Sequence, residues 1–477
     1  MEIKSKTIKD ILKVTFSNAC ILLSGILVGF LLPKIIDQVD YGYYKTFTLY
    51  IAYIGLFHFG IIDGIYLKYG DKDYNELDKE KFRFYTRFLL ILEGAISLLF
   101  IIISLFAIQE KEMKFIFVMV SLTLFSTNIT SYFQYISQIT RRFKELTLRN
   151  IVQSILISLA IISLFISYKY FRLVINFEIY TIIYVIILFL LMVWYIFAYR
   201  DITFGKASKG LYKDILYFLK IGFPLLIANL AINLIFMIDR QFVNILYDKV
   251  TYATYAFSYN MLSLITTLIN SIALVIYPTI KRSKEFNGST YQNLISIIST
   301  LVFVCLLVYY PLDLFIHWFL PKYNDSLVIF RIILPGLITS SCISIVMQNY
   351  YKLLNKNLNF FIKSLVIIAL SIGLNFLAYY IFKTPEAISV ASIIVTFIWY
   401  ITIESYFVIH YKVKFSKNLL FIVLATISFY LITMSENYIN GFVFQLVFTL
   451  NLVGVFYGGN IIHFIKKFVA EKKISKK

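Results

Sequence analysis

Long apolar segments recur along the whole chain, and each is long enough to cross a lipid bilayer. A transmembrane helix needs about 20 mostly apolar residues because each residue advances the helix by about 1.5 Å. Fourteen such segments, joined by short polar connections, can be placed in the sequence. They are residues 11–33, 43–67, 82–107, 114–140, 149–168, 176–198, 216–238, 252–280, 291–311, 326–350, 358–382, 387–410, 417–434 and 441–465. The pattern predicts an all-α polytopic membrane protein with about 14 transmembrane helices.

The composition argues against soluble and cofactor-binding classes of protein. Only 15% of the residues are charged, against about 25% in soluble domains. The three cysteines lie inside apolar segments and the four histidines are scattered, so we expect no disulfide scaffold, no metal site and no cofactor. A net charge of +19 can indicate nucleic-acid binding, but here the basic residues lie between the apolar segments, where membrane topology places them. We therefore expect membrane lipids, and no nucleic acid, as partners.

The distribution of basic residues predicts the orientation in the membrane. The N-terminus, every second connection and the C-terminus hold 34 of the 45 Lys and Arg residues, and the alternate connections hold ten. Basic connections stay in the cytoplasm during insertion. Both termini are therefore expected on the cytoplasmic side of the membrane, with the loops near Lys114, Lys169 and Lys383 outside.

An internal repeat divides the sequence. A shift of 211 residues brings the starts of the third to sixth spans onto those of the ninth to twelfth within about three residues. Each copy holds six spans, so both enter the membrane in the same direction, as in transporters that bind a substrate between two halves. The predicted domains are an N-terminal six-helix bundle at 1–210, a C-terminal six-helix bundle at 211–412, and two additional helices with a basic tail at 413–477.

Polar side chains at helical spacing form stripes along the fourth, seventh and eighth spans. Such residues either bond to neighbouring helices or line a hydrated cavity. The stripe of the fourth span runs from Thr123 to Arg141, and that of the seventh ends at Arg240, which favours a cavity. The predicted substrate-binding residues are Arg141, Arg240, Arg331, Gln134, Gln138, Asn229, Asn233, Tyr255, Tyr259 and Asn270.

Three carboxylates inside the spans are candidates for ion coupling. Glu93 lies near the middle of the third span, whereas Asp63 and Glu404 lie nearer the cytoplasmic face. A carboxyl group in low-dielectric surroundings can carry a proton. The alternative for Glu93 is a buried ion pair with an Arg of the other half, and for Asp63, which is close to Lys68 and the headgroups, a structural role is favoured.

Several short motifs resemble those of bacterial polysaccharide repeat-unit flippases. They are residues 31–34 (LLPK), 40–45 (DYGYYK), 58–64 (HFGIIDG), 68–70 (KYG), 222–227 (GFPLLI), 239–240 (DR) and 252–257 (YATYAF). Their order and spacing cover nearly the whole chain and resemble the Wzx-type O-antigen and capsule exporters of the multidrug/oligosaccharidyl-lipid/polysaccharide exporter superfamily.

The resemblance implies two six-helix bundles around a central cavity and no enzymatic activity. The implied substrate is an oligosaccharide on undecaprenyl pyrophosphate, moved from the inner to the outer leaflet. A polysaccharide polymerase and chain-length machinery are possible partners. The residues fit such a cargo independently, because Arg binds phosphate in bidentate fashion and the polar and Tyr stripes offer hydrogen bonds and ring faces to sugars.

Two other functions compete with this interpretation. A cation-coupled drug exporter of the same superfamily typically has an acidic site in the first span or the second bundle, but residues 11–33 hold Asn18 and no carboxylate. A membrane glycan polymerase would present a sizeable external loop, and the longest external connection here is only about residues 312–325. Both alternatives are therefore less favoured than the flippase.

Overall fold

The chain forms a helical protein with two compact units. The computed structural model describes the backbone of residues 2–474 apart from 71, 236, 283–285, 415 and 435–437. Side chains are not described at 1–12, 14, 228–233, 268, 270–285 and 459–477. Contacts between Cα atoms divide the chain into Met1–Ala256 and Phe257–Lys477, with the boundary inside one long helix, α11.

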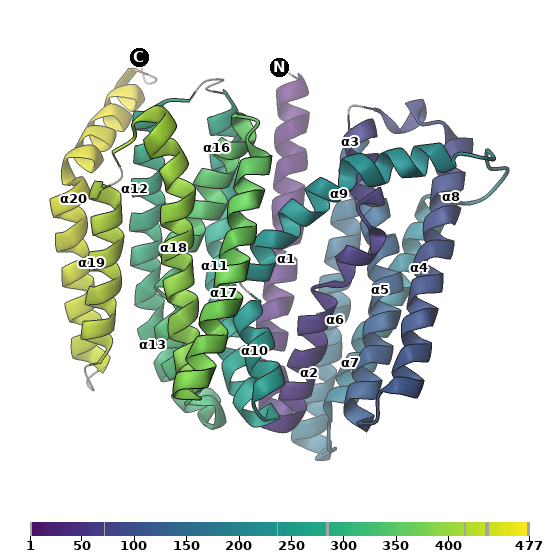
Figure 1. Cartoon of the computed structure of the whole chain (residues 1–477), viewed down its shortest axis with the longest axis horizontal. Coiled ribbons are helices and arrows are strands. Elements are labelled where there is room, and N and C mark those ends of the chain that lie inside the picture. The colour runs from purple at the N-terminus through teal and green to yellow at the C-terminus, as the bar shows by residue number, and fades with distance from the viewer. Residues whose placement is uncertain are drawn as a thin grey trace. The chain divides into compact units, whose positions relative to one another are not determined.

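The first unit consists of long helices and several short ones. Within it, α4, α5, α6 and α7 run roughly along a common direction, and α9 crosses obliquely (Figure 1). Its elements are α1 (Glu2–Ile35), α2 (Gln38–Ile51), η1 (Ile54–His58), α3 (Ile61–Tyr69), η2 (Tyr74–Glu76), α4 (Lys79–Ala107), α5 (Lys111–Ile139), α6 (Phe143–Phe171), α7 (Phe177–Ala198), α8 (Arg200–Thr203), α9 (Tyr212–Ile235), α10 (Ile238–Leu246) and the first part of α11 (Lys249–Arg282).

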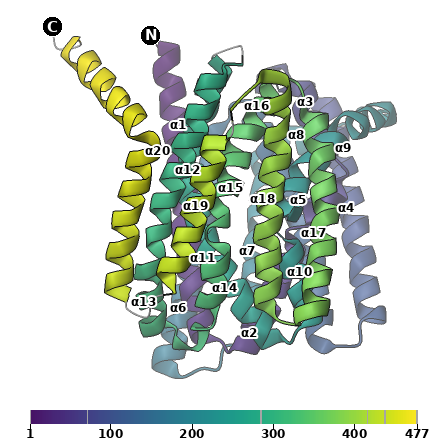
Figure 2. The ribbon, with the colours of Figure 1, turned by 60° about the vertical axis from the view of Figure 1, so that its left-hand side comes forward.

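The second unit begins in α11 and contains a bent span. Figure 2 shows two of its helix pairs, α17 with α18 and α19 with α20, packed side by side. Its elements are the rest of α11, α12 (Gly288–Cys305), η3 (Leu306–Val308), α13 (Tyr309–Phe319), η4 (Pro321–Tyr323), α14 (Ser326–Ile333), α15 (Gly336–Ser341), the π-helical η5 (Cys342–Met347), α16 (Gln348–Leu353), α17 (Asn357–Phe382), α18 (Pro385–Tyr411), α19 (Ser416–Thr433) and α20 (Tyr438–Ile474).

The predicted all-α polytopic fold is confirmed. Among the described residues, ten helices are long and apolar enough to cross a membrane, and two bent pairs raise the number to 12. The predicted spans at 216–238 and 252–280 fall on α9 and α11, whose side chains are described only in part. The predicted start of the fifth span at 149 was too late, because α6 begins at Phe143. Arg149 therefore lies inside a helix, not in a connection.

Polar residues at the helix starts explain where the spans begin. The carboxylate of Asp78 accepts hydrogen bonds from the backbone N–H groups of Glu80 and Lys81 and caps α4. Asn176 caps α7 in the same way, by accepting from Ile179 N at 3.1 Å. Such caps satisfy backbone donors that have no partner within the helix, and each contributes about 1 kcal/mol.

The second span is broken near its middle. Between α2 and α3 the chain forms the 3-10 helix η1, and the two halves of the span differ in direction by 59°. The break ends at Phe59 and Gly60, which both have positive φ (49° and 81°). Glycine adopts this left-handed conformation without the steric cost that a Cβ atom brings.

Glycines bring α3 and α9 into backbone contact. A Cβ atom on Gly222 of α9 would lie 1.9 Å from the carbonyl oxygen of Gly60, and one on Gly64 would lie 2.3 Å from the carbonyl oxygen of Phe218. Small residues at such crossings allow close packing of helices in membranes. These glycines thus hold α3, the second half of the broken span, against α9.

Candidate functional site

A polar cavity of about 240 Å³ lies within the first unit. The broken second span, α5, α6 and α7 each contribute to its wall, so the site does not depend on the second unit. Hydroxyl, amide and guanidinium groups predominate among the lining side chains. The lining residues are Ile51, Ile54, Thr123, Thr127, Thr130, Ser131, Gln134, Arg149, Gln153, Tyr184 and Leu188.

One face of α5 provides most of the polar wall. Thr123, Thr127, Ser131 and Gln134 follow one another at intervals of four, four and three residues, which places them on one side of a helix. Gln134 therefore lines the cavity, whereas Gln138, the next residue of the predicted stripe, is not among the lining residues. The polar side chains of this face line the cavity over about three turns of the helix.

Arg149 supplies a buried positive charge to the cavity. Its side chain projects from the second turn of α6 and only 8% of the residue is exposed. One guanidinium nitrogen, Nη1, donates to Oε1 of Gln153 and, at 3.4 Å, to Oδ1 of Asn150. Its Nε has no hydrogen-bond partner among the described residues, and none of their ion pairs involves it. A buried guanidinium without a counterion is costly in stability, and such a group can bind an anion.

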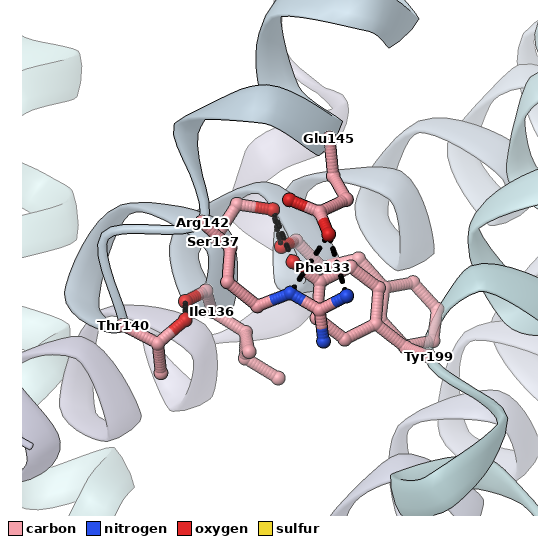
Figure 3. A network of polar contacts seen from close by, with 7 residues as sticks. All are labelled: Phe133, Ile136, Ser137, Thr140, Arg142, Glu145 and Tyr199. Carbon is pink, nitrogen blue, oxygen red and sulfur yellow. Dashed lines mark hydrogen bonds and ion pairs between the residues drawn. The ribbon is translucent and has the colours of Figure 1, made fainter. Parts of the chain in front are cut away.

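Arg142 shows the contrasting arrangement, seven residues earlier. Figure 3 shows that its guanidinium donates from both Nε and Nη2 to Oε1 of Glu145, at 2.9 and 2.5 Å. The same group stacks on the rings of Tyr74 and Tyr199, with its central carbon 4.3 and 4.6 Å from their centroids. The hydroxyl groups of Ser137 and Tyr199 are 2.7 Å apart and tie α5 to the end of α7. Glu145 balances the charge of Arg142, and the contacts described above join elements of the protein to one another. We therefore assign Arg142 a structural role.

The predicted arginines of the cavity are placed differently from one another. Arg141 is exposed at the end of α5, with a left-handed backbone (φ 53°). Arg240 is half-buried in α10, and the neighbouring Asp239 accepts a 2.8 Å hydrogen bond from the buried Tyr255 hydroxyl. Arg331, in the second unit, donates from Nη1 to the Thr433 carbonyl at 3.2 Å, at the end of α19.

The remaining predicted polar residues are Tyr259 and three asparagines. Tyr259 is half-buried in α11 in the second unit. Asn229, Asn233 and Asn270 lie outside the residues whose side chains are described. Tyr259 is not among the residues that line the cavity of the first unit.

Each predicted carboxylate is buried in a separate place. Glu93 is fully buried and accepts a hydrogen bond from Asn128. Asp63 lies 3.7 Å from Nδ1 of His58 across the helix break, whereas Lys68, expected nearby, pairs with Asp214. Glu404, in the second unit, accepts a hydrogen bond from the hydroxyl of Tyr291. Within the first unit, the ion pairs of the described residues do not include Glu93, and the alternative of an ion pair with an Arg of the other half stays a prediction.

Sequence reasoning missed Arg149, Gln153 and Tyr184. The predicted fifth segment begins at Arg149 itself, so this residue was counted among the basic residues at the cytoplasmic side. The spacing of four residues between Arg149 and Gln153 does indicate one helix face, but this signal is useful only once the helix is known to begin at Phe143.

Comparisons with known proteins agree with this fold. The family model described as "Polysaccharide biosynthesis protein" matches residues 7–284. No curated protein matches the chain. A structure of the lipid II flippase MurJ in an inward closed conformation is 17% identical, covers 95% of this chain and 100% of its own, and has a TM-score of 0.71.

Drug transporters share the fold less closely. An inward-facing multidrug resistance MATE family transporter of the MOP superfamily is 13% identical over 90% of this chain and 100% of its own, with a TM-score of 0.58. A MATE transporter of Vibrio cholerae is 14% identical over 85% and 98%, with a TM-score of 0.54. The helical membrane fold is therefore that of the exporter superfamily to which the sequence motifs pointed. Because the family model spans more than half of this multi-pass membrane protein, the chain belongs to the polysaccharide biosynthesis protein family.

Proposed function

We propose that this protein moves lipid-linked oligosaccharide repeat units from the inner to the outer leaflet for the synthesis of a surface polysaccharide such as capsule or O-antigen. The observation that carries the proposal is the polar cavity with the uncompensated charge of Arg149. An undecaprenyl-pyrophosphate-linked glycan presents an anionic group and many hydroxyl groups. The cavity offers a cation and hydrogen-bonding side chains to such a molecule.

The cavity favours anionic over cationic cargo. Guanidinium binds phosphate or carboxylate through paired, charge-assisted hydrogen bonds, which are about twice as strong as neutral ones. Arg149 has a free Nε donor for this purpose. An organic cation would instead be repelled by a buried positive charge, so this feature argues against a cation-coupled drug exporter, the second candidate function. The fold shared with MATE transporters does not decide between the two.

The further sites are part of the same proposal. Arg141, exposed at the end of α5, would meet the pyrophosphate at the cytoplasmic side. Arg240 and Arg331 would serve later in the path, and the two halves, 1–210 and 211–412, would rock against each other with 413–477 outside the repeat. Glu93, Asp63 and Glu404 remain the candidates for ion coupling. A polymerase and chain-length machinery would consume the exported unit.

Reconstitution tests the proposed function directly. The full chain is placed in liposomes with a short oligosaccharide on polyprenyl pyrophosphate, and the glycan reaching the opposite leaflet is measured with a membrane-impermeant glycosidase. We expect cleavage of nearly all of the glycan with the protein and about half without it, since half starts in the accessible leaflet. Equal cleavage in both samples, together with uptake of an organic cation dye, would establish the drug-exporter alternative.

The orientation is a separate prediction. Both termini are expected in the cytoplasm, so single cysteines at Gln109, between α4 and α5, and at Lys383, between α17 and α18, should react with an impermeant thiol reagent applied to whole cells. A cysteine at Lys209, between α8 and α9, should react only after the cells are opened. Protection of Gln109→Cys and Lys383→Cys with labelling of Lys209→Cys would reverse the topology.

A further inference from the structure

Glu93 is a buried carboxyl group with a single donor. The residue has no exposed surface, and its Oε2 accepts a 2.8 Å hydrogen bond from Nδ2 of Asn128 on α5. Its Oε1 has no hydrogen-bond partner among the described residues, and their ion pairs do not include it. An ionised carboxylate in such surroundings costs several kcal/mol. The arrangement therefore fits a proton-bound Glu93.

Asn128 connects this carboxyl group to the broken span. A side-chain amide has two N–H donors on one nitrogen, and Nδ2 of Asn128 also donates to the carbonyl oxygen of Ile54 at 3.1 Å. Ile54 is the first residue of η1, where the second span leaves α-helical geometry. The amide of Asn128 thus holds Glu93 on one side and the helix break on the other.

The same break forms part of the cavity wall. Ile51 and Ile54 line the cavity opposite Thr123 and Thr127 of α5. Asn128 lies next to Thr127 in sequence but on a different face of α5, toward α4. A shift of the Ile54 segment would therefore change the width of the cavity without disturbing its polar side chains.

We propose that Glu93 and Asn128 form a proton-binding site that sets the conformation of the broken second span and, through Ile54, access to the cavity. With the proton bound, Asn128 holds the Ile54 carbonyl and the bent form is stable. When the proton leaves, the hydrogen bond from Asn128 Nδ2 to the charged carboxylate becomes about twice as strong and draws the amide nitrogen toward Glu93, away from the Ile54 carbonyl. The Ile54 carbonyl then loses its partner, and the segment is released. The inference deepens the proposed function and rests on it for the identity of the cargo.

Other titratable groups lie on the elements packed against α4. On η1, Nδ1 of His58 accepts a hydrogen bond from Gly60 N and faces Asp63 of α3 at 3.7 Å. On α5, the hydroxyl of Tyr132 is 2.9 Å from that of Thr86. On α8, the backbone carbonyl oxygen of Asp201 accepts a 2.9 Å hydrogen bond from Nε of Arg83. His58 and Asp63 form the second titratable pair at the break, so the experiment has to separate them from Glu93.

Thiol labelling of the cavity tests the site without any glycan. Thr127→Cys is introduced after replacement of Cys20, Cys305 and Cys342, and the full chain is reconstituted in liposomes. Its labelling rate is measured at about pH 6 and about pH 8, with and without Glu93→Gln, a neutral mimic of the protonated carboxyl. The ratio of the two rates at each pH cancels the ionisation of the cysteine itself.

We expect this ratio to be near one at the lower pH and to change by at least about threefold at the higher pH, where Glu93 loses its proton. Asn128→Ala, which removes the link to Ile54, should give the high-pH ratio to Glu93→Gln at both pH values. Tyr132→Phe is the matched control, because it removes another hydrogen bond between α4 and α5, and it should keep the response, as should His58→Asn.

An unchanged ratio at both pH values would overturn the proposal, and so would loss of the response in Tyr132→Phe. Loss of the response in His58→Asn alone would assign the effect to the His58–Asp63 pair and equally overturn it. If Glu93→Gln does not accumulate, the comparison of Asn128→Ala with Tyr132→Phe decides in its place. Because no lipid-linked glycan is present, failure here leaves the flippase assay unaffected, and failure of that assay leaves this result standing.

Discussion

Replacing Arg149 with Gln is expected to abolish transport while leaving the protein folded. Loss of one partner of a buried charge pair costs about 2–5 kcal/mol, so glycan translocation should fall by about thirtyfold or more. Arg149→Lys should restore only part of the rate, because an ammonium group cannot make the paired hydrogen bonds of a guanidinium. The measurement is the reconstituted glycosidase assay, normalised to the amount of protein in the liposomes.

The stability of the same variants separates a binding role from a structural one. Arg149 is buried and has no counterion among the described residues, so its removal should leave the thermal unfolding temperature in detergent unchanged or higher. Arg142→Gln is the matched control. It loses the bonds to Glu145 and the stacking on Tyr74 and Tyr199, and should reduce the yield of folded protein more than the rate per molecule. Unimpaired transport by Arg149→Gln would show that Arg149 does not bind the substrate.

Gly222→Ala is expected to prevent accumulation of the folded protein. The added methyl group would lie 1.9 Å from the Gly60 carbonyl oxygen and 2.4 Å from Gly64 N. Both are backbone atoms, so no side-chain rotation relieves the clash, and the cost should reach or exceed the upper end of the about 1–3 kcal/mol typical of overpacking. The measurement is the fraction of protein that remains monodisperse after extraction from the membrane.

Gly94→Ala in α4 is the control for helix propensity. There the new Cβ would meet only Cε2 of Phe125 at 3.7 Å, an ordinary contact. Alanine is favoured over glycine within a helix by up to about 1 kcal/mol, so this variant should be as stable as the wild type or more so. Normal accumulation of Gly222→Ala would show that α3 and α9 do not pack as closely as described.

The spans were predictable from the sequence because the length of an apolar segment reflects the thickness of the bilayer. The break in the second span was not, since residues 43–67 are mostly apolar and their interrupting residues, among them Lys45, His58, Gly60 and Asp63, do not mark any one point as a break. Hydropathy measures transfer into lipid and carries no information on where a helix changes direction. That change depends here on the contact between Gly60 and Gly222, which are far apart in the chain.

The candidate site was predictable in part, for a similar reason. The polar face of α5 follows from its spacing, and Gln134 was found in this way. Asn128 was missed because it lies off that face. Its proposed role depends on its hydrogen bonds to Glu93 and Ile54, which belong to other elements. Likewise, Arg142 and Arg149 look equivalent in the sequence. Only the tertiary structure shows that Glu145 neutralises the first and not the second.

The irregular backbone at residues 52–60 also restricts how the first unit can face its surroundings. Peptide groups that lack a partner within a regular helix cannot be exposed to acyl chains, because acyl chains neither accept nor donate hydrogen bonds. The apolar, exposed side chains of Ile91 and Phe106 on α4 suit contact with hydrocarbon, whereas the segment from Ala52 to Gly60 does not. Annular lipids are therefore confined to the perimeter formed by unbroken helices, and any sideways route for a prenyl chain has to avoid the kinked segment.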